Sequence, residues 1–198
     1  MILTHLGKTP EIHPSAYVAP SATVCGDAVI GPNSRIMFGA TVIAEGGRIV
    51  VGENCIVMEN AVVRSTALHS TTIGNCCLIG PNAHVIGCTI EDEVFIATGA
   101  AIFHGAHLGK ASEVRVNGVV HIKTRVVPGE TVPIGWVAVG DPAKILPPDR
   151  HAAIWKIQKP LNFPMTVYGI DRDEADMRKI TQRVVDALAA HKGDTVVS

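Results

Sequence analysis

Aromatic side chains are scarce in this sequence. Phe, Trp and Tyr make up 4% of the 198 residues, although hydrophobic residues reach 47%. The core must therefore consist of Val, Ile and Ala, which suit stacked strands better than a helix-rich fold. No run of about 18 apolar residues occurs, so we expect no membrane-spanning helix and no membrane partner. The N-terminal stretch also lacks the features of a signal peptide, which predicts a cytoplasmic protein.

The sequence also lacks an excess of positive or negative charge, and it lacks a cysteine pattern typical of disulfide bonds. The 17 basic and 18 acidic residues give a net charge of −1, so we expect no nucleic-acid partner. The cysteines are odd in number and form no CxxC pair, which argues against a disulfide framework and against a sulfur-ligated zinc site. We expect reduced structural thiols at all five positions, namely Cys25, Cys55, Cys76, Cys77 and Cys88.

A six-residue repeat organises most of the chain. Aliphatic residues recur at this spacing, and a small residue usually follows four positions later. One large and one small inward position in every six residues predict a short strand and a tight corner, and three such strands close a triangular coil. The aliphatic positions are Ile12, Val18, Val24, Ile30, Ile36 and Val42, then Val51, Val57 and Val63, then Ile73, Ile79 and Val85, and finally Ile90, Ile96, Ile102, Leu108 and Val114.

Interruptions of the count, and its end, predict the loops and the domain limits. The steps from 42 to 51 and from 63 to 73 exceed six residues, so "AEGG" and "STALHSTT" are expected to bulge from corners. After the coil, "PPDRHAAIWKIQK" predicts a short helix. A second helix is expected further on, with Met177, Ile180, Val184 and Leu188 on one face that packs on the coil or on a neighbouring subunit. We therefore predict an all-β solenoid over residues 11–146 and a C-terminal helical extension over residues 147–198.

The repeat resembles that of the hexapeptide-repeat superfamily, whose fold is the left-handed parallel β-helix. The handedness comes from this resemblance alone. Within the superfamily, the run from Val51 to Lys144 is similar to the γ-class carbonic anhydrases. The similarity includes the long step after Val63, the "HGA" at 104–106 and the "GDPAK" at 140–144. It implies a homotrimer, with the γ-class zinc site lying between subunits.

The same resemblance implies that the zinc site is missing. The three histidine ligands of the γ class fall on Arg64, Pro81 and Ile86, and none of these side chains can coordinate zinc. The polar Gln–Asp pair of the class falls on Met58 and Glu59. We therefore expect no metal or other cofactor, less than stoichiometric zinc and no carbonic anhydrase activity.

The cleft that remains is predicted to be apolar with one fixed positive charge. An arginine in such a surrounding favours a small carboxylate or a similar anion, and Arg64 is its main candidate residue. The alternative is that Arg64 pairs with Glu59 or with a carboxylate of the next subunit and fills the space. His84 stands two residues before the former ligand position, too far for a zinc bond, and is expected at a corner. The candidate ligand-binding residues are Arg64, Glu59, Met58, Pro81, Ile86, Phe103 and His84.

Two further hypotheses remain open, and with them the question of whether the protein is an enzyme. The first is a metal-dependent hydratase or hydrolase of the carbonic anhydrase type, with zinc held by relocated ligands. Those ligands would come from His69, His84, His104 and His107. The second is a hexapeptide acyltransferase that uses a CoA thioester, with His69 as the catalytic base. No substrate can be read from the sequence.

Overall fold

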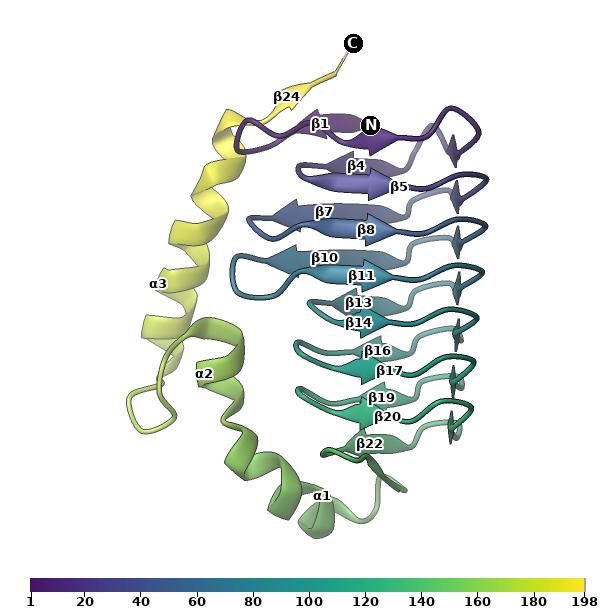
Figure 1. Cartoon of the computed structure of the whole chain (residues 1–198). Helices are drawn as coiled ribbons and strands as arrows, with labels where there is room; N and C mark the ends of the chain where they lie inside the picture. The colour runs from purple at the N-terminus through teal and green to yellow at the C-terminus, as the bar shows by residue number, and fades with distance from the viewer. Residues whose placement is uncertain (198) are drawn as a thin grey trace.

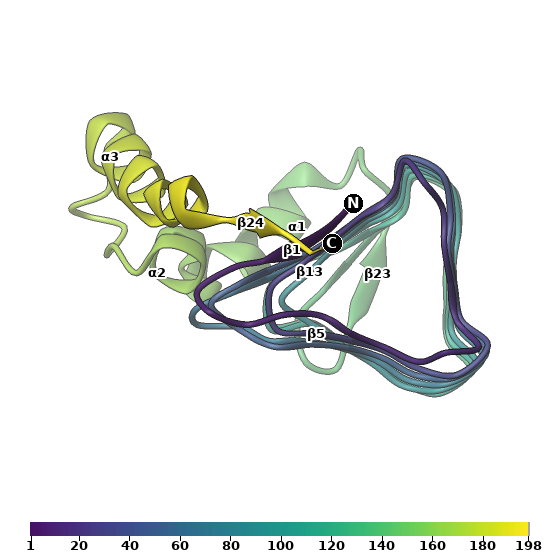
Figure 2. The same cartoon turned by 90° about the horizontal axis from the view of Figure 1, so that it is seen from above.

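The computed structural model describes residues 1–197 and shows a three-sided solenoid with an extension along one edge (Figure 1). The coil is a left-handed parallel β-helix of about eight turns, which confirms the predicted fold class. Seen from above, the turns superpose as a triangle (Figure 2). Each side of this triangle is one sheet, and we name the sheets I, II and III.

Each turn adds one strand to each sheet, so strands three apart in sequence are neighbours. Sheet I contains β1 (Ile2–Thr4), β4 (Thr23–Cys25), β7 (Thr41–Glu45), β10 (Val62–Thr66), β13 (His84–Ile86), β16 (Ala101–Ile102), β19 (Val119–Val120), β22 (Val137–Val139) and, antiparallel at its two ends, β23 (Lys144–Leu146) and β24 (Thr195–Val196). Sheet II contains β2 (Glu11–Ile12), β5 (Ala28–Ile30), β8 (Ile49–Val51), β11 (Thr71–Ile73), β14 (Thr89–Ile90), β17 (His107–Leu108) and β20 (Arg125–Val126). Sheet III contains β3 (Tyr17–Val18), β6 (Arg35–Ile36), β9 (Ile56–Val57), β12 (Leu78–Ile79), β15 (Phe95–Ile96), β18 (Glu113–Val114) and β21 (Thr131–Val132).

The aliphatic residues of the repeat form the core as in-register columns. In sheet I, one inward column pairs Val42 with Val63 and Val63 with Val85 on successive strands. These three side chains are fully buried, and burial of each stabilises the fold by about 1.5–3 kcal/mol. The six-residue period is therefore the spacing of one side of the triangle.

The corner between sheets III and I has a left-handed backbone in successive turns. Gly or Asn stands there, since these residues adopt a positive φ at the lowest cost. The residues are Gly39, Asn60, Asn82, Gly99, Asn117 and Gly135, with φ angles between 54° and 72°. A side chain at Gly39 would also meet the Asn60 Oδ1 atom of the next turn at 2.2 Å.

The extension runs from the last turn back to the first. It contains α1 (His151–Gln158), a 3-10 turn (Lys159–Leu161), α2 (Phe163–Tyr168), α3 (Met177–Leu188) and a second 3-10 turn (Ala189–Gly193), and it ends in β24. β24 pairs with β1, so both ends of the chain meet at the first turn (Figure 1). β1 itself pairs with β4 in parallel, ahead of residue 11, where we predicted the solenoid to begin.

Helix α3 stands off the solenoid, beyond one corner of the triangle (Figure 2). On its predicted apolar face, Met177 is 67% exposed and Leu188 is 39% exposed. The expected packing of this face on the coil is therefore not seen within one chain. No helix among residues 1–197 combines the length and the apolar character needed to cross a membrane.

The five cysteines are free thiols, as predicted. Cys25, Cys55, Cys77 and Cys88 are buried, whereas Cys76 is exposed. The loop predictions hold only in part. Of "STALHSTT", only residues 67–70 form the corner loop, because Ser65 and Thr66 end β10 and Thr71 and Thr72 begin β11. β7 likewise continues through Glu45 into the predicted "AEGG" bulge, where it pairs with β10.

Candidate functional site

One outward-facing column of sheet I holds several of the predicted site residues. Alternate residues of these strands point away from the core, and Ile43, Arg64 and Ile86 pair in register on β7, β10 and β13. Cys25 precedes them on β4, while Phe103 and His121 follow just after β16 and β19. We call this set the outer column: Cys25, Ile43, Arg64, Ile86, Phe103 and His121. It brings the expected ligand positions 64 and 86 side by side.

Arg64 is held by the carboxylate of Glu45, which is not among the residues predicted from the sequence. Its Nη2 atom donates to Oε2 of Glu45 at 2.5 Å, and the side chains are 34% and 19% exposed. The predicted internal pairing with Glu59 is therefore wrong about the partner. Glu45 was missed because its segment was interpreted as a loop. The Nε atom of Arg64 is buried and has no hydrogen-bond partner within residues 1–197.

Two histidines meet beside Arg64, at the corner between sheets I and II. His69 comes from the loop after β10, and His104 comes from the corner after β16. Their rings lie edge to face, with centroids 5.5 Å apart. The corner between them is the tight turn at Gly87. A Cβ atom there would lie 2.7 Å from His69 Cβ and 3.1 Å from His104 Cδ2, so the pair requires glycine at this position.

The surroundings favour the neutral form of both imidazoles. Burial, followed by the charges of His69 and Arg64, lowers the pKa of His104 to about 4. Burial and then the charge of Lys123 lower the pKa of His69. The Nδ1 atoms of both rings are buried and have no partner among the described residues. Neutral imidazoles can act as metal ligands, general bases or hydrogen-bond donors.

The other two histidines of the relocated-ligand hypothesis lie elsewhere. His84 is the exposed first residue of β13, so the expectation of a corner position is wrong. His107 lies on β17 in sheet II, and its Nε2 atom is 2.7 Å from Oε1 of Glu91. A zinc ion bound by protein side chains takes three or four of them. The structure therefore brings together only two of the four, His69 and His104.

Three of the predicted cleft residues lie at a different place on the same chain. Met58, Glu59 and Pro81 occupy the corner between sheets III and I, before β10 and β13. Arg64, Ile86 and Phe103, in contrast, lie on the outer column. A single chain does not collect all the predicted residues into one pocket.

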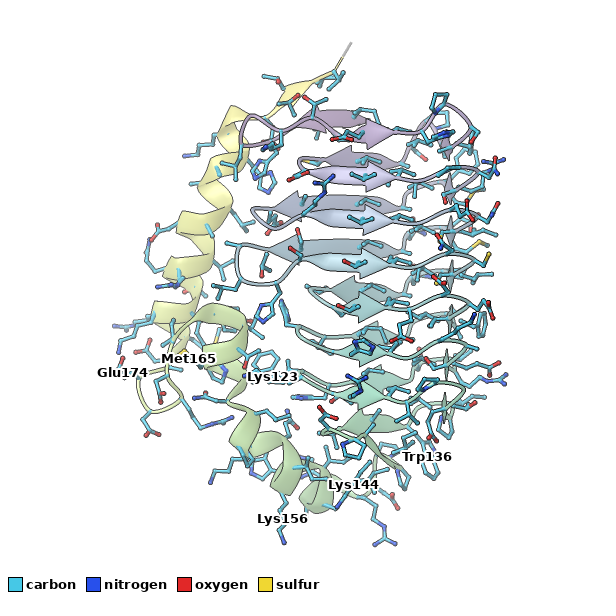
Figure 3. The ribbon with its side chains drawn as sticks, viewed as in Figure 1. Lys123, Trp136, Lys144, Lys156, Met165 and Glu174 are labelled. Carbon is cyan, nitrogen blue, oxygen red and sulfur yellow. The ribbon has the colours of Figure 1, made fainter. Side chains whose placement is uncertain are left out.

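The extension covers the end of the outer column that lies nearest the last turn. The ring of Phe163 on α2 is 6.3 Å from that of Phe103 and 6.1 Å from that of His121. Tyr168 packs on Phe163 from the same helix, at 6.1 Å. Lys123 lies at the edge of the solenoid that faces α2 (Figure 3). Helix α2 is not predictable from the sequence pattern, because its six residues are too few to show a helical period.

A hollow of about 980 Å³ lies between α2 and α3, away from the histidine pair. Its lining mixes acidic and basic side chains, among them Glu174, Arg178, Lys179 and Arg183. It has no buried polar groups that converge on one point. Ligand sites usually combine an apolar wall with a few converging polar groups, so we assign no ligand to this groove.

Comparison with known proteins identifies the family. Over 145 residues, the chain is 35% identical to gamma carbonic anhydrase 1, mitochondrial, and 32% identical to gamma carbonic anhydrase 2, mitochondrial, both from Arabidopsis thaliana. The chain is a γ-carbonic-anhydrase-like protein of the hexapeptide-repeat superfamily. Each alignment covers 70% of this chain and 50% of the relative, so the γ-carbonic-anhydrase-like chain spans about half the length of these relatives.

The solved structures agree on the fold of this γ-carbonic-anhydrase-like chain. The crystal structure of a hexapeptide transferase family protein from Anaplasma phagocytophilum superposes with a TM-score of 0.54 at 21% identity. The match covers 96% of this chain and 93% of the other. No protein-family model matches the sequence. The predicted cytoplasmic location stays a prediction.

Proposed function

We propose that the protein is a homotrimer whose inter-subunit cleft binds a small carboxylate or a similar anion, and that it neither holds the family zinc nor hydrates CO₂. Arg64 carries this proposal. Its guanidinium stays charged at any ordinary pH, is held in place by Glu45 and keeps a third of its surface exposed on the outer column. Such a fixed cation can receive a carboxylate with little loss of side-chain entropy.

A second copy of the chain would complete the cleft. The corner between sheets III and I exposes Phe38, Val116 and Ile134, at 49%, 39% and 69%. Apolar side chains aligned in this way are typical of surfaces that a partner covers. Met58, Glu59 and Pro81 lie on the same corner. If this corner of one subunit packs against sheet I of the next, these residues face the partner's outer column, and a threefold arrangement repeats the contact.

The residues at the three ligand positions explain why we expect no CO₂ hydration. A zinc ion activates water by lowering its pKa to about 7, and this requires side chains with free lone pairs. Arg64, Pro81 and Ile86 offer none. The neutral pair His69 and His104 could accept or release a proton near Arg64, but it does not replace a Lewis acid.

The first test is of assembly and ligand binding. Light scattering of the purified protein at micromolar concentration should give three times the chain mass, and calorimetry with acetate, oxalate, malonate and benzoate should detect binding of at least one acid. Arg64→Ala should abolish this binding, and Arg64→Lys should restore only part of it because the two-pronged contact is lost. Arg48→Ala is the matched control, since Arg48 is 53% exposed and lies 3.8 Å from Asp27. A monomer, or no binding by any acid, would overturn the proposal.

Two other activities are tested alongside it. The pair His69 and His104 supplies two of the three or four ligands that a relocated zinc site needs, which makes that site the second candidate. It predicts CO₂ hydration that is lost on chelation and in His104→Gln. The acyltransferase hypothesis predicts CoA-thioester binding that depends on His69. The Nδ1 atom of His69 has no hydrogen-bond partner within residues 1–197, so no described side chain orients the ring as a base.

A further inference from the structure

Four potential metal ligands meet at the first turn of the solenoid. His5 follows β1 and Cys25 ends β4, while His191 and Asp194 belong to the end of the extension. One ligand atom of each residue lies within 4.8 Å of the ligand atoms of the other three. The four residues come from three separate parts of the chain, which the pairing of β1 with both β4 and β24 brings together.

The side chains converge on the Asp194 carboxylate. His5 Nδ1 lies 2.6 Å from Oδ1, His191 Nδ1 lies 2.8 Å from Oδ2, and Cys25 Sγ lies 3.7 Å from Oδ2. The two imidazole rings are stacked, with centroids 4.3 Å apart and 23° between their planes. Both rings therefore present a nitrogen to the same small region.

The surroundings exclude most water from this region. The exposed fractions are 3% for His5, 2% for Cys25, 13% for the Asp194 side chain and 31% for that of His191. Two imidazoles, one thiol and one carboxylate are the donors that zinc and similar divalent transition metals prefer, whereas Mg²⁺ and Ca²⁺ prefer oxygen alone. Four protein ligands also make a closed site, which is typical of structural rather than catalytic zinc.

We propose that His5, Cys25, His191 and Asp194 bind one zinc-like divalent transition metal ion, which fastens the extension to the first turn. The ion enters between the four side chains, and the Cys25 thiol releases its proton to solvent when the Cys25–metal bond forms. Burial and then the charge of Asp194 raise the pKa of that thiol to about 11 in the metal-free protein, so the ion competes with a tightly held proton.

Glu45, which lies on the far side of the His191 ring, also fits a metal site. The second ring nitrogen of His191, Nε2, lies 3.6 Å from Oε1 of Glu45. Histidines that bind a metal usually donate their other N–H to a carboxylate or a carbonyl, which orients the ring. The other oxygen of Glu45 holds Arg64. The ion would therefore also steady Arg64, although the metal proposal stands whether or not Arg64 binds an anion.

Cobalt binding tests the proposal directly. Apo-protein from chelation should take up one Co²⁺ per chain, with the visible bands of a tetrahedral site and a near-ultraviolet band from the thiolate–cobalt bond. One equivalent of Zn²⁺ should remove both. Cys25→Ser should lose the near-ultraviolet band and bind at least tenfold more weakly, and Cys88→Ser is the control because Cys88 is equally buried. His191→Gln, which changes a partly exposed residue, should also weaken binding at least tenfold.

A second measurement tests whether the ion fastens the extension to the first turn. The Val197 amide donates to the Ile2 carbonyl at 2.9 Å, so hydrogen exchange at Val197 reports on the docked C-terminal strand. Zn²⁺ should slow this exchange in the wild type but not in Cys25→Ser, with circular dichroism used to confirm that the variant is folded. No cobalt uptake, or a band unchanged in Cys25→Ser, would overturn the proposal and leave a metal-free clasp of one carboxylate and two imidazoles.

Discussion

The ion pair between Arg64 and Glu45 should contribute measurably to stability. Exposed pairs contribute up to about 1 kcal/mol, whereas removing one partner of a buried pair costs roughly 3–5 kcal/mol. Arg64 is 34% exposed and Glu45 is 19% exposed, and their N–O distance is 2.5 Å. This intermediate burial predicts a loss of about 2 kcal/mol in the free energy of unfolding for Arg64→Ala. For a chain of this size, the melting temperature should fall by about 4–8 °C.

A double-mutant cycle isolates the pair from the packing of each side chain. We expect a coupling energy of about 1–2 kcal/mol between Arg64→Ala and Glu45→Ala in urea denaturation. Glu59→Ala is the control, since Glu59 was the partner expected from the sequence and makes no ion pair within residues 1–197. A coupling near zero for Glu45, or an equal coupling for Glu59, would refute the reasoning from the observed contact.

Three further predictions follow from the corner and the outer surface. The pKa of His104 falls from 6.5 to about 4 on folding, so the unfolded chain binds more protons than the folded chain between these pH values. The stabilising contribution of the neutral ring should therefore be complete above pH 6.5, and the free energy of unfolding should fall by about 3 kcal/mol towards pH 4. In urea titrations, His104→Gln should flatten this pH dependence. Gly87→Ala should lower the melting temperature more than the control Gly129→Ala. Both residues have a positive φ, but of the two only Gly87 has neighbours within 4 Å of a new Cβ atom. An equal fall in melting temperature for the two variants would contradict the tight packing at Gly87. Ile134→Asp should dissociate the proposed trimer in light scattering, whereas Leu68→Asp, also on the surface, should not. A variant Ile134→Asp that keeps the mass of three chains would contradict the proposed interface.

The fold was predictable because each coil repeats one physical pattern. A buried aliphatic residue every six positions, with Gly or Asn at the corner, can be recognised in the sequence of each coil. Val42, Val63 and Val85 stack as this spacing predicts. The ends were harder to predict. β1 has no partner within the first ten residues, and its pairing with β4 and β24 depends on contacts from elsewhere in the chain.

The candidate site was predictable only where it follows the repeat. Arg64 and Ile86 are neighbours because they occupy equivalent positions in successive turns. His69 and His104 were named as candidates, but their meeting depends on the short corner at Gly87, which no spacing rule indicates. His5 and Asp194, 189 residues apart, meet because the extension returns to the first turn.

The course of the extension also indicates which part of the outer column stays accessible. At one end, Phe163 packs against Phe103 and His121. At the other end, Asp194 lies against Cys25, and His191 reaches Glu45. The extension therefore occupies both ends of the column, and the middle, where Arg64 and Ile86 lie, keeps partial exposure. A ligand or a neighbouring subunit that approaches sheet I meets this charged and apolar pair. The extension that covers both ends thus leaves the middle of the column accessible.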